Sequence, residues 1–106
     1  MPNPDFNPQS FDSTDILEKQ KYDYPGKFKV LIYNDNYTTM EFVISILTGI
    51  FNKDIEEATN LMLKVHKNGW AAVGTYTREV AETKILKAEG EARINSYPLK
   101  LTMEKV

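Results

Sequence analysis

The sequence contains no cysteine and only one histidine, His66. Without cysteine, the chain can form no disulfide bond, no iron–sulfur cluster and no thiol-based catalytic site. A single histidine makes a zinc site improbable, and no loop typical of cofactor binding is present. These absences set aside most metal and nucleophile chemistry, and we expect neither a metal ion nor a cofactor.

Long apolar runs and an excess of positive charge are also lacking. No stretch approaches the roughly 18 apolar residues of a membrane-spanning helix. The start MPNPDFNPQS has neither the basic nor the apolar region of a secretory signal. We therefore expect a cytoplasmic protein. With 13 basic and 15 acidic residues, the net charge of −2 gives no electrostatic sign of binding to nucleic acid or to an anionic membrane.

Proline is scarce except near the N-terminus, where four of the five prolines lie within the first 26 residues. Residues 1–26 also carry five acidic side chains and two lysines, a net charge of −3, whereas residues 27–106 have a net charge of +1. Proline opposes helices and strands, and the apolar residues of this segment are sparse. We interpret residues 1–26 as a flexible, disordered extension and residues 27–106 as one compact domain.

The compact domain is predicted to contain three strands, because three apolar segments have strand-like composition: Lys27–Tyr33, Trp70–Tyr76 and Leu99–Met103. Three helices are predicted between them. The first opens with a capping box that runs from Thr38 to Glu41, with Thr38 as the N-cap. The second begins at Asp54 and ends at Gly69, and the third runs from Arg78 to about Ile94 after Thr77.

The order β-α-α-β-α-β predicts a small α/β (α+β) sandwich, in which three helices pack on a three-stranded antiparallel sheet. In the second helix, five residues at helical spacing are expected to form one buried stripe: Ile55, Ala58, Leu61, Met62 and Val65. A domain of this size has room for a shallow pocket and not for a deep catalytic cavity.

Three polar side chains are candidates for a binding site. Asn34 and Asp35 follow the first strand, although a run of Asn-Asp-Asn is most often ordinary turn chemistry. His66 lies one helical turn after Met62, at the edge of an apolar stripe, where a histidine is usually a packed structural residue. Binding groups in α/β domains nevertheless converge at strand ends, which favours a site formed by the three together.

A free α-amino group suits these three side chains, because an ammonium carries three donors that need acceptors. The Asn34 amide oxygen, the Asp35 carboxylate and a neutral His66 nitrogen can supply them. An alternative is a small acid–base enzyme that uses Asp35 and His66. No nucleophile, oxyanion site or cofactor loop accompanies that pair, so we assign no catalytic residue and do not expect an enzyme.

Three separated motifs, YNDNYTTMEFV, ATNLMLKVHKNG and GTYTREVAETK, closely resemble the ClpS family over residues 27–106. That family comprises the adaptor proteins of the N-end rule pathway in bacteria and plastids. The resemblance implies binding of N-degrons, which are proteins whose N-terminal residue is Leu, Phe, Tyr or Trp. It also implies their delivery to the N-terminal domain of a Clp AAA+ unfoldase, ClpA or ClpC, for degradation by ClpP.

The resemblance also assigns roles to individual residues. Asn34, Asp35 and His66 match the positions that bind the α-amino group and the first peptide unit. Met40 matches the residue that screens against β-branched side chains. Six further residues match the lining of the side-chain pocket: Ile32, Thr38, Val43, Met62, Val65 and Leu99. Glu79 and Lys84 match contacts to the unfoldase, although without the resemblance they would be interpreted as an ordinary solvated helix face.

The sequence departs from the family pattern at two positions. Asn36 stands where many members have a second aspartate, and Thr39 where many have proline. The first departure reduces the local negative charge; neither changes the three central polar residues. We expect a monomer. The alternative function is a general protein-interaction module that docks onto a ring ATPase or a ribosome and has no pocket for a terminal residue.

Overall fold

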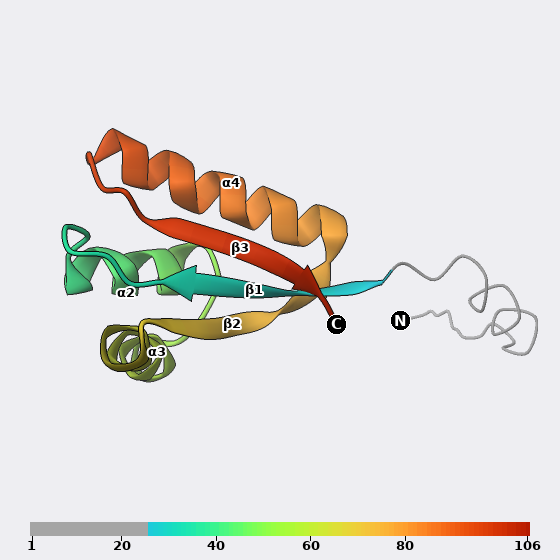
Figure 1. Cartoon of the computed structure of the whole chain (residues 1–106), viewed down its shortest axis with the longest axis horizontal. Helices are drawn as coiled ribbons and strands as arrows, with labels where there is room; N and C mark the ends of the chain where they lie inside the picture. Colours follow the sequence, from blue (N-terminus) through green and yellow to red (C-terminus); the bar gives the residue numbers. More distant parts are fainter. Residues whose placement is uncertain (1–25) are drawn as a thin grey trace, which may run out of the picture.

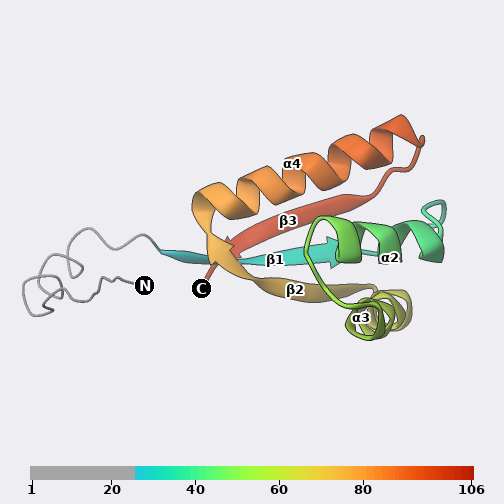
Figure 2. The ribbon, with the colours of Figure 1, turned by 180° about the vertical axis from the view of Figure 1, so that it is seen from behind.

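The structure, a computed structural model, describes residues 26–106. The chain forms three strands and three helices in this order: β1 (Lys27–Tyr33), α2 (Met40–Gly49), α3 (Ile55–Asn68), β2 (Trp70–Thr77), α4 (Arg78–Ile94) and β3 (Lys100–Lys105). The helices gather on one face of the sheet (Figures 1 and 2). The predicted sandwich is confirmed, whereas the predicted extension lies, apart from Gly26, outside the described residues.

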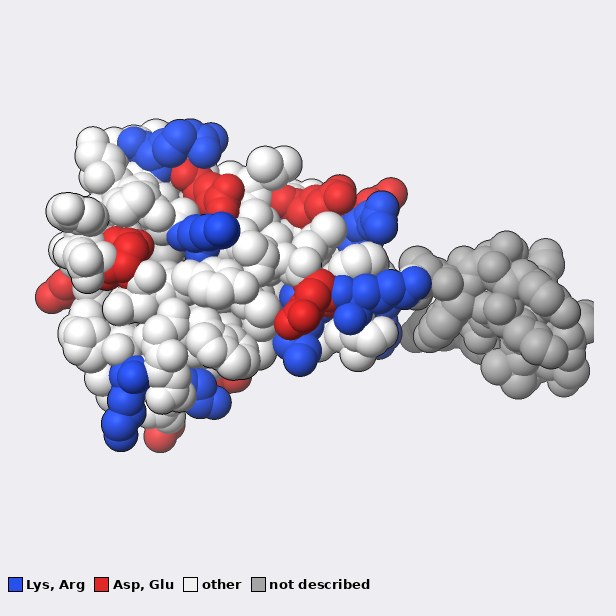
Figure 3. All heavy atoms as spheres, viewed as in Figure 1, with Lys and Arg blue, Asp and Glu red and all other residues white. Residues whose placement is uncertain are grey.

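Strand β1 lies at the centre of the sheet, between β2 and β3, and pairs antiparallel with both. Ile32 is opposite Ala71 on one side and Leu101 on the other, and all three belong to the buried core. The helix-free face of the sheet is seen in Figure 3. Uncharged side chains cover much of its middle, and Lys and Arg gather near the end where β1 begins.

The start of α2 differs from the prediction by one residue. Thr39 is the N-cap, and its hydroxyl oxygen accepts a hydrogen bond from the Phe42 amide at 3.1 Å. The predicted cap, Thr38, instead donates its hydroxyl to a carboxylate oxygen of Asp35 at 2.7 Å. Two adjacent threonines offer the same capping group, and the tertiary position of Asp35 decides between them.

The ends of α3 and α4 agree with the prediction. Asp54 caps α3 by accepting from the Glu57 amide at 2.8 Å, and Thr77 caps α4. Gly69 ends α3 with a φ of 93°, in the left-handed region that favours glycine. These caps set where α3 and α4 begin and where α3 ends.

The core lies between the sheet and the helices. Val30 and Ile32 of β1 are completely buried, as is Leu47 of α2. Three alanines of α4 face the sheet (Ala81, Ala88 and Ala92), and their small side chains let the helix approach it closely. The predicted buried stripe of α3 is wrong for Ile55, which is 65% exposed because the first turn of α3 extends beyond the core.

Within residues 26–106, no helix has the length and apolar character of a membrane span.

Candidate functional site

Backbone hydrogen bonds hold the end of β1 next to the end of α3. Tyr33 pairs with Trp70 at the start of β2, and the Asn34 amide donates to the carbonyl oxygen of Gly69 at 2.9 Å. Gly69 follows the last turn of α3, which carries His66. The sheet therefore brings the β1–α2 loop to the turn of α3 that holds the single histidine.

Asp35 organises the β1–α2 loop. One carboxylate oxygen accepts hydrogen bonds from the amides of Tyr37 and Thr38, at 2.8 and 2.7 Å, and the other accepts from the Thr38 hydroxyl. Burial alone raises the pKa of Asp35, but these hydrogen bonds from Thr38 and Tyr37 outweigh it and hold the pKa below its usual value of 3.8. The side chain is therefore a carboxylate at neutral pH and holds the loop in one conformation.

A hollow of about 410 Å³ opens between this loop and the two helices. Its polar side is formed by the loop and by His66, and its apolar wall by Val43 of α2 with Met62 and Val65 of α3. Met40, in the first turn of α2, also lines it and is 42% exposed. The arrangement places hydrogen-bonding groups beside an apolar wall, which suits a ligand with a polar head and an apolar side chain.

The hollow brings together eight of the ten residues that the sequence placed in the binding site: Asn34, Asp35, Thr38, Met40, Val43, Met62, Val65 and His66. The other two, Ile32 and Leu99, do not line it. They are 0% and 5% exposed and lie in the core cluster that also contains Val43, Met62 and Val65. The sequence could not separate a wall residue from one packed behind the wall, because both are apolar.

The structure adds three lining residues that were not predicted for the site: Asn36, Tyr37 and Thr39. Tyr37 is 73% exposed, which is unusual for a large aromatic side chain. The available signal was its position, one residue beyond Asn34-Asp35-Asn36 in a loop that already contained candidate residues. Its exposed ring stands at the edge of the hollow, where a ligand can pack against it.

The side chains of Asn34 and His66 are exposed. Within the described part of the chain, neither side chain forms a hydrogen bond with another protein group. By contrast, both oxygens of Asp35 are already engaged. The three polar residues thus differ in kind: Asn34 and His66 offer unused polar atoms, and Asp35 supplies fixed negative charge beside them.

Residues 26–106 contain no group of His, Asp and Glu side chains arranged to hold a metal ion.

Glu79 and Lys84 lie elsewhere, on α4, where both line a second hollow of about 460 Å³. The Lys84 ammonium donates to the carbonyl oxygen of Ile50 at 2.7 Å and lies 5.8 Å from the Phe51 ring and 5.6 Å from the Tyr76 ring. Lys84 is therefore anchored across the domain, unlike a freely solvated lysine. Glu79 is exposed beside it.

The fold and the polar–apolar hollow define a small peptide-binding domain, and comparison with known proteins identifies its family. A family model described as "ATP-dependent Clp protease adaptor protein ClpS" matches residues 23–102. The chain belongs to the ClpS family.

Individual ClpS relatives are similar in sequence to this chain over most of their length. The ClpS adapter protein of Lawsonia intracellularis is 45% identical over 107 residues, which cover 100% of this chain and 98% of the relative. That of Desulfatibacillum aliphaticivorans is 50% identical over 95 residues, 88% of this chain and 91% of the relative. A solved structure of Agrobacterium tumefaciens ClpS2 bound to L-phenylalaninamide superimposes with a TM-score of 0.75 at 33% identity, covering 77% of this chain and 99% of the other.

Proposed function

We propose that this protein is an adaptor of the Clp protease that binds N-degrons beginning with Leu, Phe, Tyr or Trp. The observation that carries this proposal is the hollow in which the unused polar atoms of Asn34 and His66 lie beside an apolar wall. The ligand of the Agrobacterium relative, L-phenylalaninamide, has the matching parts: a free α-amino group and an aromatic side chain. Membership of the ClpS family supports the same function.

The α-amino group is bound at the polar side of the hollow. Asn34 and His66 accept hydrogen bonds from the ammonium and from the first peptide unit through the atoms that no other protein group uses. Asp35 contributes in two ways: it keeps the loop in place through Thr38 and Tyr37, and its negative charge attracts the ammonium. A blocked N-terminus lacks both the charge and two of the donors.

The side chain of the first residue enters the apolar part of the hollow, against Val43, Met62 and Val65. Ile32 and Leu99 stiffen this wall from the core behind it. Met40 is unbranched and half exposed at the start of α2, so it can close over a flat or γ-branched side chain. A branch at the β-carbon meets Met40 near the opening and is disfavoured.

Delivery uses a different surface. Glu79 and Lys84 contact the N-terminal domain of the unfoldase, ClpA or ClpC, and the anchoring of Lys84 to Ile50 fixes the position of that positive charge. Residues 1–26 engage the unfoldase during the handover. The protein acts as a monomer in the cytoplasm, and it binds and transfers its substrate without a catalytic step of its own.

The decisive experiment compares a fluorescent peptide that begins with Phe with its N-acetylated form. Acetylation removes the positive charge and two donors, so we expect the affinity to fall by about 100-fold in fluorescence anisotropy. An array of peptides that differ only in the first residue should show the preference for Leu, Phe, Tyr and Trp over Val and Ile. Equal binding of free and acetylated peptides would instead support a general interaction module without a terminal-residue pocket.

A further inference from the structure

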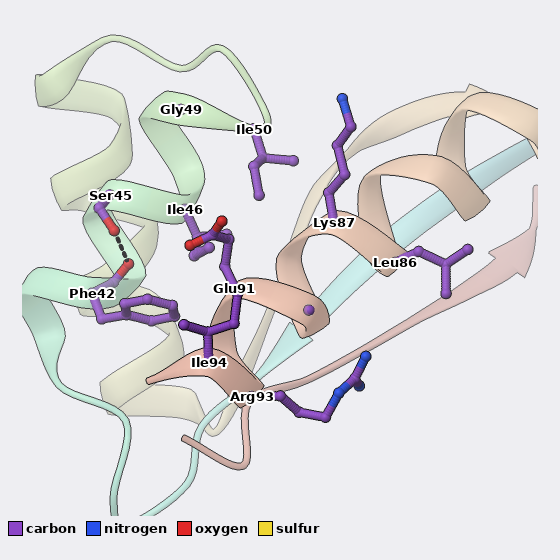
Figure 4. A pocket seen from close by; sticks show the side chains of 11 residues that line it. Phe42, Ser45, Ile46, Gly49, Ile50, Leu86, Lys87, Glu91, Arg93 and Ile94 are labelled. Carbon is purple, nitrogen blue, oxygen red and sulfur yellow. Dashed lines mark hydrogen bonds between the residues drawn. The ribbon is translucent and has the colours of Figure 1, made fainter. Parts of the chain in front are cut away.

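A larger hollow lies away from the proposed N-degron site. It has a volume of about 810 Å³ and lies between α2 and α4. Figure 4 shows the side chains of Phe42 and Ile46 on α2 facing those of Ile94 and Glu91 on α4, with Ile50 and Lys87 toward one end. Leu86 and Arg93 point away from α2 in this view.

Two helical glycines keep this hollow open. Gly49 ends α2 and Gly90 lies in the last third of α4, and a Cβ atom added at either would have no neighbour within 4 Å. Glycine inside a helix is less stable than alanine, and here the surrounding fold does not require it. The absence of side chains leaves helix backbone accessible, so another segment of chain can approach closely.

The hollow continues toward the start of the domain. It shares Gly49, Ile50 and Lys87 with the hollow that contains Lys84, and that hollow shares Glu79 with a third one of about 450 Å³. The third hollow is also lined by Gly26, the first described residue. The three hollows together form what we call the long groove, which runs from the point where residues 1–25 join the domain to the end of α4.

The charge of the long groove is opposite to that of residues 1–25. Leaving out Arg93, which points away from α2, four cationic and two acidic residues line it, a net charge of +2: Arg78, Lys84, Lys87 and Lys105 against Glu79 and Glu91. Residues 1–25 carry five acidic residues and two lysines, a net charge of −3, together with apolar residues that match the groove: Phe6, Phe11, Ile16 and Leu17. Twenty-five residues span at most about 85 Å, whereas α4 is about 25 Å long.

We propose that residues 1–25 bind within the same chain along the long groove. Their acidic side chains pair with the groove lysines and Arg78, and their apolar side chains cover Phe42 and the exposed Ile94, over the open backbone of Gly90. The segment then covers Glu79 and Lys84, so it competes with the unfoldase for that surface and is released when the unfoldase binds. This competition rests on the proposed function; the intramolecular binding does not.

A chain of residues 1–106 allows a direct test, because it contains no cysteine that would have to be removed. A nitroxide spin label is attached to the variant Ser13→Cys, and NMR records the paramagnetic broadening of each amide, with the reduced label as reference. We expect the signals of Gly49, Lys87 and Gly90 to lose most of their intensity, and those of His66 and Leu31 to keep theirs. Broadening limited to the first residues after Gly26, or spread evenly over the domain, would overturn the proposal.

Matched variants test whether the groove itself holds the segment. Gly90→Leu fills the groove and should abolish the broadening, whereas Gly90→Ala adds one methyl group in open space and should leave it. Likewise, Lys87→Glu should reduce the broadening several-fold, and Lys64→Glu, an equal charge change on an exposed position of α3, should not. If Gly90→Leu and Lys87→Glu leave the broadening unchanged, the groove is not the binding surface and the proposal is wrong.

One further sample tests whether the groove binds the segment of its own chain or that of a second copy. Isotope-labelled protein without the nitroxide is mixed with unlabelled protein that carries it, and we expect no broadening. Broadening in this mixture would show that the groove binds another molecule and would overturn the intramolecular proposal. None of these measurements uses an N-degron peptide or an unfoldase. A negative result here therefore leaves the proposed function standing, and a negative peptide experiment leaves this proposal standing.

Discussion

Two hollows lie on different faces of α2, and they differ in size and in chemistry. The smaller, of about 410 Å³, uses Met40 and Val43, and the larger, of about 810 Å³, uses Phe42 and Ile46. The smaller combines an ordered polar loop with unused polar atoms, and the larger combines an apolar surface with lysine and helix backbone. If the proposed function is correct, unused hydrogen-bonding groups, and not volume, distinguish the site for a small charged ligand.

The largest expected effect concerns Asp35, the residue that gives the smaller hollow its polar order. Asp35→Ala removes three hydrogen bonds from the loop and one negative charge, so the affinity for a Phe-initiated peptide should fall by about 100-fold or more. Asp35→Asn keeps an acceptor for the Thr38 amide and loses the charge, so it should have a smaller effect. Isothermal titration calorimetry measures both variants.

If Asp35→Ala left peptide affinity unchanged, the smaller hollow would not be the N-degron site. If Asp35→Asn were as damaging as Asp35→Ala, the charge would matter more than the ordering of the loop. Glu79→Ala, on the other surface, serves as the comparison and should leave peptide affinity as it is.

The second prediction separates binding from delivery. Lys84→Ala removes the hydrogen bond to the Ile50 carbonyl and the positive charge above Phe51. Degradation of a Phe-initiated reporter by ClpA or ClpC with ClpP should slow by about 10-fold, as expected when one partly buried charged contact is lost. Peptide affinity should not change. Lys64→Ala, at an exposed position on α3, is the matched control. If it slowed degradation as much as Lys84→Ala, Lys84 would have no particular role in delivery.

The third prediction concerns pH and tests His66 as an acceptor. A protonated imidazole has no acceptor nitrogen, so if His66 accepts a hydrogen bond, peptide affinity measured from pH 8 to pH 5 should fall several-fold. The peptide's own amine becomes more fully charged as the pH falls and works in the opposite direction. A flat profile would indicate that His66 acts as a donor, and His66→Ala should abolish the dependence.

Asp35 does not account for a change in that range. Its pKa is lowered in the folded protein, so its contribution to stability is complete above the unfolded-state value and is lost only as the pH falls through the still lower folded value. The loop should therefore keep its order between pH 5 and pH 8. Amide signals of Tyr37 and Thr38 that change only below pH 3.8 would confirm this.

The smallest expected effect compares glycines of the two regions. Gly69, whose carbonyl oxygen accepts a hydrogen bond from the backbone amide of Asn34, has a φ of 93°, so Gly69→Ala should destabilise the protein by about 1 kcal/mol. Gly90 has ordinary helical geometry and open space at its Cβ, so Gly90→Ala should stabilise it by roughly 0.5–1 kcal/mol. Urea unfolding followed by circular dichroism measures both. A loss of stability with Gly90→Ala would show that Gly90 has a structural role.

Several features of the fold follow from local chemistry and were predicted well. The caps at Asp54 and Thr77 were found because a side-chain oxygen three residues before an unpaired amide is a local arrangement. The glycine that ends α3 follows from the same kind of local rule. The prediction of Thr38 as a cap was wrong because its hydroxyl has a second possible partner, Asp35, whose position depends on the loop.

Most residues that line the smaller hollow were named from the sequence, but their arrangement was not. Asn34, Asp35, His66 and most of the apolar wall could be named from the sequence. The predicted ClpS family membership is confirmed. The sequence did not distinguish Ile32 and Leu99, which lie in the core, from the residues that line the hollow. It also did not reveal the long groove, because Gly49 and Gly90 are 41 positions apart and line one hollow only in the folded chain.

The sequence alone therefore determined the order of strands and helices, most of their ends and the chemical types available for binding. These depend on the spacing of residues close together in the chain, which hydrophobic periodicity and capping rules describe. Only the tertiary structure decided which of those groups meet. The antiparallel pairing of β1 with β2 places Asn34 against Gly69 and so brings the β1–α2 loop to His66. Such contacts join residues more than 30 positions apart, and no local rule of spacing contains them.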